Sequence, residues 1–160
     1  MDKRLLMYCG LYCGDCIRYK SRFSDLSREL EGSLKEVDFA KYAEVKSRSV
    51  RELQPYEAFL SFLSALTKLQ CTTPCRDRND QETPFPCEIR DCCRDKGYQG
   101  CWECDGMETC RAFGFLEPFH GESPKKNLEK VRKWGLQEGI RLREKCYRWQ
   151  EQTECQGDDG

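Results

Sequence analysis

Thirteen cysteines stand among the 160 residues of this chain, and eight of them fall between positions 71 and 110. So many thiols constrain the fold before any periodicity is considered, because each must be cross-linked, metal-bound or buried. The chain has one histidine, so any metal site must be built almost entirely from thiolates. The cysteines therefore predict a domain held together by metal or by disulfides.

Whether the thiols bind metal or form disulfides depends on the redox state of the cellular compartment. Residues 1–9 contain no apolar stretch long enough for a signal peptide, and no apolar run approaches a membrane span. The number of cysteines is odd and their spacings are short, whereas disulfides mostly close longer loops. We therefore expect a reduced, cytoplasmic metalloprotein without membrane contact rather than a disulfide scaffold.

The apolar core available to the chain is thin. Hydrophobic residues make up 38% of the sequence, but this share includes the cysteines. Without them it is about 30%, which is low for a domain of this length. Bound metal would supply the missing stability.

The periodicity of the apolar residues predicts helices on either side of the cysteine-rich segment. Three- and four-residue steps favour an amphipathic helix from Phe23 to about Val45, and a second helix from Tyr56 to Leu69 with Pro55 near its first turn. Because the second stretch is the most apolar of the chain, we expect it at the centre of the core. Beyond the cysteines, Ser123 and Pro124 indicate the start of a further helix.

The predicted fold class is mainly α, with amphipathic helices around an irregular cysteine-rich metal-binding knot and little strand. A short helix is expected at 88–96 with Gly97 as its terminator, one at 123–134 stopped by Gly135, and another at 138–150. We expect one domain over residues 1–150 that carries a cysteine-rich insert at 71–110. Residues 151–160 are expected to form a disordered acidic tail.

The spacing of the cysteines is typical of metal ligands. Two or three intervening residues let one knuckle present two thiolates to a single ion, and tetrahedral sulfur sites suit zinc or iron–sulfur clusters. Three cysteines fit an incidental role instead: Cys93 beside Cys92, Cys146 on a helix pattern, and Cys155 in the tail. The predicted metal ligands are the other ten, namely Cys9, Cys13, Cys16, Cys71, Cys75, Cys87, Cys92, Cys101, Cys104 and Cys110.

Two functions suit these ligands. In the first, closed all-cysteine zinc sites are structural, and the protein is an interaction module or adaptor; a closed site leaves no open position, so we do not expect catalysis. In the second, Cys9, Cys13 and Cys16 join a distant thiolate to hold an iron–sulfur cluster with a redox or sensing role. The two C-x-x-C pairs lack the βαβ context of a thioredoxin-like motif.

Charge argues against nucleic acid as the partner. The formal net charge is −1 at pH 7, and metal-bound thiolates would make it more negative. Nine basic residues against three acidic ones lie between positions 125 and 148, but they are spread around the predicted helices rather than striped. The partner is unknown, and a protein fits this surface better than nucleic acid or a membrane.

Two motifs carry a resemblance to a known family. Residues 8–16 read Y-C-G-L-Y-C-G-D-C, and residues 87–92 read C-E-I-R-D-C, followed by Cys101-x2-Cys104 and Cys110. Over roughly Tyr8 to Gly139 the chain resembles a cysteine-rich family of unknown function found in bacteria and archaea. The resemblance implies a small cytoplasmic prokaryotic protein, metal-binding cysteines at the ten positions above, and no established activity. Three residues separate Cys71 from Cys75 where the family usually has two.

Overall fold

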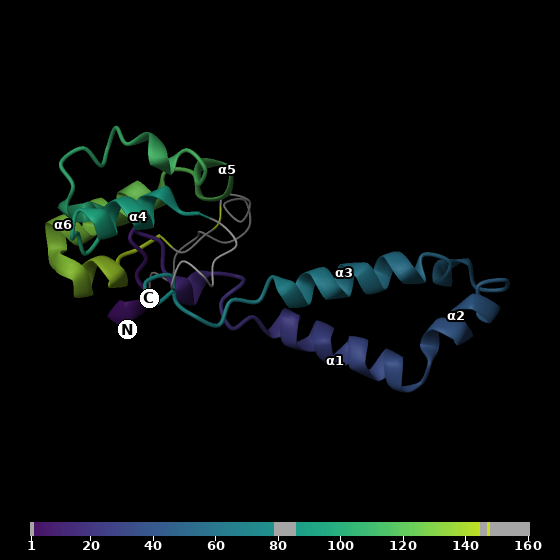
Figure 1. The fold of residues 1–160 in the computed structure, drawn as a ribbon. Coiled ribbons are helices and arrows are strands. Elements are labelled where there is room, and N and C mark those ends of the chain that lie inside the picture. The colour runs from purple at the N-terminus through teal and green to yellow at the C-terminus, as the bar shows by residue number, and fades with distance from the viewer. Residues whose placement is uncertain (1, 79–85, 145–146, 148–160) are drawn as a thin grey trace, which may run out of the picture. The chain divides into compact units, whose positions relative to one another are not determined.

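The protein is mainly helical, as predicted, in a computed structural model that describes residues 2–78, 86–144 and 147 (Figure 1). The described residues form no sheet; two isolated bridges pair Leu6 with Tyr12 and Tyr19 with Cys71. The chain divides into two compact units: unit 1 comprises Met1–Cys16 and Thr73–Gly160, and unit 2 comprises Ile17–Thr72. The predicted tail at 151–160 lies outside the described residues, as do Cys146 and Cys155.

Unit 2 is built from the helices α1 (Arg22–Glu36), α2 (Phe39–Lys46) and α3 (Tyr56–Lys68). The single helix predicted from Phe23 to Val45 is wrong in one respect, because it breaks between α1 and α2. Asp38 has a left-handed backbone with φ of 49°, a conformation that Asp adopts more readily than most residues. In contrast, α3 follows the predicted bounds closely.

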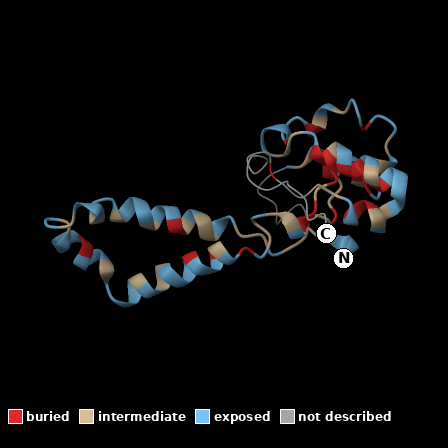
Figure 2. Ribbon diagram, turned by 180° about the vertical axis from the view of Figure 1, so that it is seen from behind, coloured by how far each residue is buried: buried red, intermediate tan, exposed pale blue. Residues whose placement is uncertain are grey.

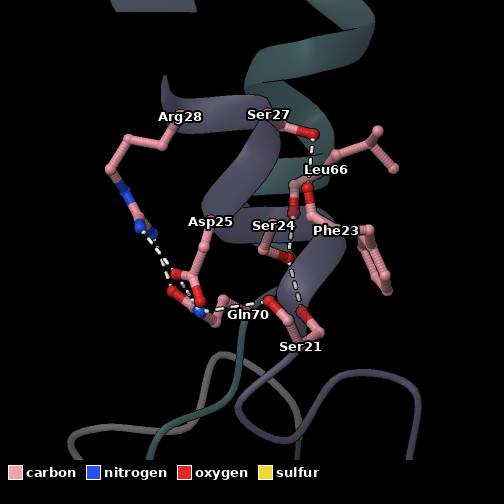
Figure 3. A network of polar contacts seen from close by, with 8 residues as sticks. All are labelled: Ser21, Phe23, Ser24, Asp25, Ser27, Arg28, Leu66 and Gln70. Atoms are coloured by element: carbon pink, nitrogen blue, oxygen red, sulfur yellow. Dashed lines mark hydrogen bonds and ion pairs between the residues drawn. The ribbon is translucent and has the colours of Figure 1, made fainter. Parts of the chain in front are cut away.

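Small residues bring α1 and α3 together in antiparallel orientation. Ser24 and Ser27 of α1 are buried at 0% and 5% exposure. The Ser24 hydroxyl donates to the Leu66 carbonyl of α3 at 2.8 Å and accepts from the Ser21 hydroxyl at 2.7 Å (Figure 3). The absence of bulk at these positions lets the helices approach, and the hydroxyls satisfy their hydrogen bonds in the contact.

The expectation that α3 forms the centre of the core is wrong. Within α3, which is described throughout, Leu63 is the buried residue, whereas Phe59, Phe62 and neighbouring Leu69 are exposed (Figure 2). The physical reason is the layer architecture, because a helix in a two-helix hairpin buries one stripe against its neighbour and leaves the rest uncovered.

The larger core lies in unit 1, around α4 (Glu88–Asp95), α5 (Glu117–His120) and α6 (Ser123–Arg141). Gly97 follows α4 with φ of 69°, as the predicted terminator requires. Gly135 interrupts α6 with φ of 78°, but the helix resumes and ends at Arg141. Positions 148–150 of the helix predicted at 138–150 lie outside the described residues. The most deeply buried side chains of this unit include Leu6, Ile89, Cys93, Met107, Leu128 and Ile140.

Polar contacts bind the segment after α6 to α6 itself and to the N-terminal segment of unit 1. The Asn127 side chain is buried and exchanges hydrogen bonds with the backbone of Glu144, accepting at 2.7 Å and donating at 3.3 Å. Arg143 forms a bidentate ion pair with Asp15 at 2.6 and 2.7 Å, and its guanidinium lies 4.1 Å from the centre of the Tyr12 ring.

None of the helices in the described parts of the chain combines the length and apolarity needed to cross a bilayer.

Candidate metal centre

Cysteines form part of the main core of unit 1. Cys9, Cys93 and Cys101 are buried in one cluster with Ile89, Met107, Phe113, Leu116 and Leu128. Three more cysteines, Cys87, Cys104 and Cys110, are partly buried and pack against that cluster. Six thiols from four short segments therefore share one interior, and the following paragraphs refer to these six as the thiol core.

The backbone around Cys9 is held in a tight turn. The Met7 N–H donates to the Leu11 carbonyl at 2.7 Å, and the Gly10 N–H donates to the Met7 carbonyl at 3.2 Å. Gly10 has φ of 87°, and a Cβ there would lie 2.4 Å from the Pro124 carbonyl oxygen. A side chain at position 10 is thus excluded both by backbone conformation and by space, so the turn that aims Cys9 inward requires glycine.

The thiols of Cys93 and Cys101 are in direct contact, with 3.5 Å between their sulfurs. Cys93 lies on the inner face of α4, and Cys101 begins the short 3-10 turn Cys101–Glu103. The Cys101 N–H donates to the Tyr8 carbonyl at 2.9 Å, which ties this turn to the segment that carries Cys9. Three separate stretches of chain are thereby joined around two sulfurs.

Protonation of these two thiols is linked. The hydrogen bond between them lowers the pKa of Cys93. The same hydrogen bond and then burial raise the pKa of Cys101 strongly, and the nearby thiols Cys93, Cys9 and Cys110 raise it further. A second negative charge in this pair is therefore strongly disfavoured unless a cation accompanies it.

Two further thiols, those of Cys75 and Cys87, act electrostatically on Cys9. Burial raises the pKa of the Cys9 thiol to about 12, and Cys75 and Cys87 contribute to the rise. Burial also raises the pKa of Cys75, with Cys87 as the next cause, while Arg90, Arg78 and Arg76 oppose it. Several thiolates here would repel one another, and the arginines partly offset that repulsion.

Arginine 76 is fixed beside this group by aromatic and backbone contacts. Its guanidinium lies 4.6 Å from the centre of the Tyr8 ring and 5.4 Å from that of Trp102. Its Nε donates to the Leu6 carbonyl. These contacts hold a permanent positive charge at the edge of the thiol core, where it stabilises thiolates.

Cys92 and Cys104 belong to a more exposed edge of the same region. Both raise the pKa of Lys96, Cys92 more than Cys104. Arg132 of α6 donates to the Trp102 carbonyl at 3.0 Å and to the Cys104 carbonyl at 2.7 Å. These bonds fix the C-W-E-C turn against α6.

Cys16 lies in a different environment. It lines a small cavity of about 50 Å³ whose wall includes Asp15, His120, Glu144 and Tyr147. His120 packs on the Tyr147 ring at 4.7 Å, and burial lowers its pKa. Cys13 is buried in the 3-10 turn Cys13–Asp15 nearby in sequence.

Cys71 is part of unit 2. Its N–H donates to the Arg18 carbonyl at 2.7 Å, and its own carbonyl accepts from the Lys20 N–H at 2.9 Å. These bonds close the base of the hairpin where the chain enters and leaves it. The boundary between the two units therefore falls between Cys71 and Cys75, which the spacing predicts as one knuckle.

The predicted ligands are thus distributed over several places. Cys9, Cys75, Cys87, Cys101 and Cys110 interact with one another in unit 1, directly or through a shared neighbour. Among the described residues, no group of three or more Cys, His, Asp or Glu side chains is arranged to hold a metal ion. The donor chemistry of the thiol core fits a soft metal, but the sulfurs would have to close further around it.

Sequence reasoning missed the position of Cys93. Adjacency to Cys92 suggests that the two cannot share an ion, yet it does not decide which of them faces inward. The helical period does, because Cys93 lies four residues after the apolar Ile89 and therefore on the same face of α4. In the structure Ile89 and Cys93 are buried, and Cys92 is exposed.

Comparison with known proteins places the chain in a family without a known activity. Searches among curated proteins and among solved structures gave no match. A family model described as a protein of unknown function, DUF3795, matches residues 5–114, which include all ten predicted ligands, nine of them in unit 1, and the whole of unit 2. Because this match covers more than half of the chain, the protein belongs to the DUF3795 family.

Proposed function

We propose that unit 1 binds zinc through its thiol core and that the metal is structural, so that the protein serves as a metal-stabilised interaction module of a reducing compartment. The observation that supports this most directly is the pair formed by Cys93 and Cys101, with 3.5 Å between the sulfurs. Two thiolates on one tetrahedral zinc, each about 2.3 Å from the ion, lie roughly 3.8 Å apart. The pair therefore already has nearly the spacing of two zinc ligands.

The neighbours of this pair supply the remaining donors. The thiols of Cys93, Cys9 and Cys110 all raise the pKa of Cys101, and Cys9 is buried in the same cluster as Cys93 and Cys101, with Cys110 packed against it. We assign these four to the first zinc site. Cys75 and Cys87 also raise the pKa of Cys9 and would contribute to a second site.

Charge and burial favour a divalent ion at this place. Buried thiols resist ionisation because a thiolate loses its hydration, and each further thiolate adds repulsion. A zinc ion reverses both effects, since it neutralises two charges and bonds to the sulfurs. A four-thiolate zinc site has no open position and no redox chemistry, so its contribution is folding free energy rather than catalysis.

The proposal is tested by metal content after purification without air. We expect zinc in a fixed ratio to protein and no visible absorbance near about 400 nm. Iron with acid-labile sulfide would instead support the alternative hypothesis, an iron–sulfur cluster held by Cys9, Cys13 and Cys16. Protein that folds fully with neither metal would remove the proposal.

Variants then identify the ligands. Cys101→Ser and Cys110→Ser should each lose about one zinc per chain, because serine is a poor ligand for this ion. Cys16→Ser is the matched control: it makes the same change in a cysteine that lines the cavity beside His120, and it should keep the wild-type zinc content. Equal zinc loss in all three variants would contradict the assignment.

A further inference from the structure

The hairpin of unit 2 carries a continuous exposed apolar face. On α1 and the residue after it, Phe23, Leu26, Leu30 and Val37 follow one another at three-, four- and seven-residue steps. On α3 and the residue after it, Phe59, Phe62, Leu66 and Leu69 follow at three- and four-residue steps. Six of these eight side chains, Leu26, Leu30, Val37, Phe59, Phe62 and Leu69, are 42 to 67% exposed.

The two stripes lie on the same face of the hairpin. In each helix the stripe precedes the buried contact by one residue: Phe23 and Leu26 precede Ser24 and Ser27, and Phe62 precedes Leu63. One residue is a rotation of about 100°, and in antiparallel neighbours the same rotation turns both stripes to the same side. The open hollow lined by Leu30 and Leu34 from α1 and by Phe59 from α3 agrees with this.

We propose that this face is the interface of a homodimer, in which two hairpins pack face to face as a four-helix bundle. Alternate three- and four-residue spacing is the pattern of a and d positions in such bundles. No charged residue occupies either stripe. This proposal does not depend on the zinc proposal, because it uses unit 2 alone.

The area of the face is sufficient for a second copy. The exposed fractions correspond to roughly 500 Å² of apolar surface per chain, at the upper end of what a typical monomer leaves uncovered. Two such faces together bury about 1,000 Å² before any polar rim is counted, which is about the minimum for a biological interface. A two-helix layer also needs a second layer to bury its apolar side.

Charges toward the outer edge of the α1 stripe favour one arrangement. Arg22 and Glu36 stand at opposite ends of α1. A two-fold axis perpendicular to the helices sets each helix against its own copy in antiparallel orientation. Arg22 of one chain then lies near Glu36 of the other.

An axis parallel to the helices would not pair these charges. It would place α1 of one chain over α3 of the other, so Arg22 and Glu36 would not meet. The hydrogen bonds between Ser24 and Leu66 and between Asp25 and Gln70 set the level of the two helices. By that register the middle of α1, near Leu30, and the middle of α3, near Phe62, lie at the same height, so one perpendicular axis serves both helices.

The first experiment measures the mass of the full chain by sedimentation equilibrium from about 1 to 100 µM, where a specific dimer of this area is populated. We expect twice the 18.8 kDa of one chain. Phe62→Asp should weaken the dimer about 100-fold or more, because it places a charge in the apolar interface. Ser61→Asp is the matched control, since it adds the same residue to the exposed side of α3, and the dimer should persist.

A second set of variants keeps the test decisive if Phe62→Asp also damages the hairpin. Arg22→Glu should weaken the dimer about fivefold at low salt, and adding Glu36→Arg should restore it, because the pair is then reversed. Both changes suit the helix dipole of α1, so neither should unfold it. A monomer at 100 µM, or a dimer indifferent to Phe62→Asp and to the charge reversal, would overturn the proposal; in the first case the face is covered by another partner or from within the chain.

Discussion

The two units of this protein differ in where their large apolar side chains lie. Unit 1 draws distant segments together around large buried side chains and thiols. In unit 2 the buried contact is made of serines, Ala43 and one leucine, while many of its large apolar side chains are exposed. Unit 1 therefore depends on what lies inside it, and unit 2 on what lies against it.

Metal removal is the strongest way to break this comparison. Stripping zinc with a chelator under reducing conditions should unfold unit 1, since structural thiolate zinc contributes on the order of 10 kcal/mol to small domains. The helices of unit 2 should persist, because Cys71 is held there by backbone bonds and α1 contacts α3 through serines. Hydrogen exchange read by peptide should show loss of protection at 86–144 and retention at 22–68.

Uniform exchange over both ranges after metal removal would show that the units unfold together. Unchanged protection at 86–144 would contradict the structural role of the metal. Treatment of the Cys101→Ser variant, which should lack the first zinc from the start, separates loss of metal from side effects of the chelator.

Matched leucine truncations give the next largest effect. Leu128 of α6 is fully buried among the core side chains of unit 1, and Leu63 of α3 is 5% exposed in the hairpin. Leu128→Ala should cost about 3–5 kcal/mol of unfolding free energy and Leu63→Ala about 2 kcal/mol, because the hairpin has fewer neighbours to lose and more room to relax. Leu142→Ala, at a partly exposed leucine, is the control and should cost under about 1 kcal/mol.

Denaturant unfolding of the holo protein, followed by hydrogen exchange to assign each transition to its unit, measures these costs. Equal losses for Leu128→Ala and Leu63→Ala would mean that the hairpin interior is as well packed as the core of unit 1. The contrast between an inside-dependent and an outside-dependent unit would then fail.

The same contrast explains what could be predicted from the sequence. Helix positions followed from local periodicity and from glycines such as Gly97 and Gly135, whose backbone angles are indeed left-handed. The sequence did not show which helix forms the core, because an apolar segment tends to be buried but its sequence does not say which element covers it. α3 is the most apolar segment, yet Phe59 and Phe62 remain exposed.

The prediction that the cysteines bind metal stays a prediction, but the structure shows which of them come together. Several thiols of the 71–110 segment share one interior with Cys9. Cysteine spacing cannot tell which thiols meet, because that depends on contacts between distant segments, such as the Cys101 N–H with the Tyr8 carbonyl. Position on α4, rather than spacing, brings Cys93 to the centre.

The smallest predicted effect tests the serine contact of the hairpin. The Ser24 hydroxyl is buried, donates to the Leu66 carbonyl at 2.8 Å and is bonded to Ser21 at 2.7 Å (Figure 3). Ser24→Ala keeps the close approach of α1 and α3 but leaves the Ser21 hydroxyl without this partner, so it should cost about 1 kcal/mol of unfolding free energy.

Ser33→Ala is the control, at an exposed serine of the same helix. It should be neutral or slightly stabilising, because alanine favours helix. Thermal unfolding of both variants distinguishes the two; it must be measured at one protein concentration, because dimer formation contributes to stability. A neutral Ser24→Ala would mean that close packing alone, without the hydrogen bonds, holds α1 and α3 together, so that unit 2, like unit 1, would be stabilised mainly by its packed interior.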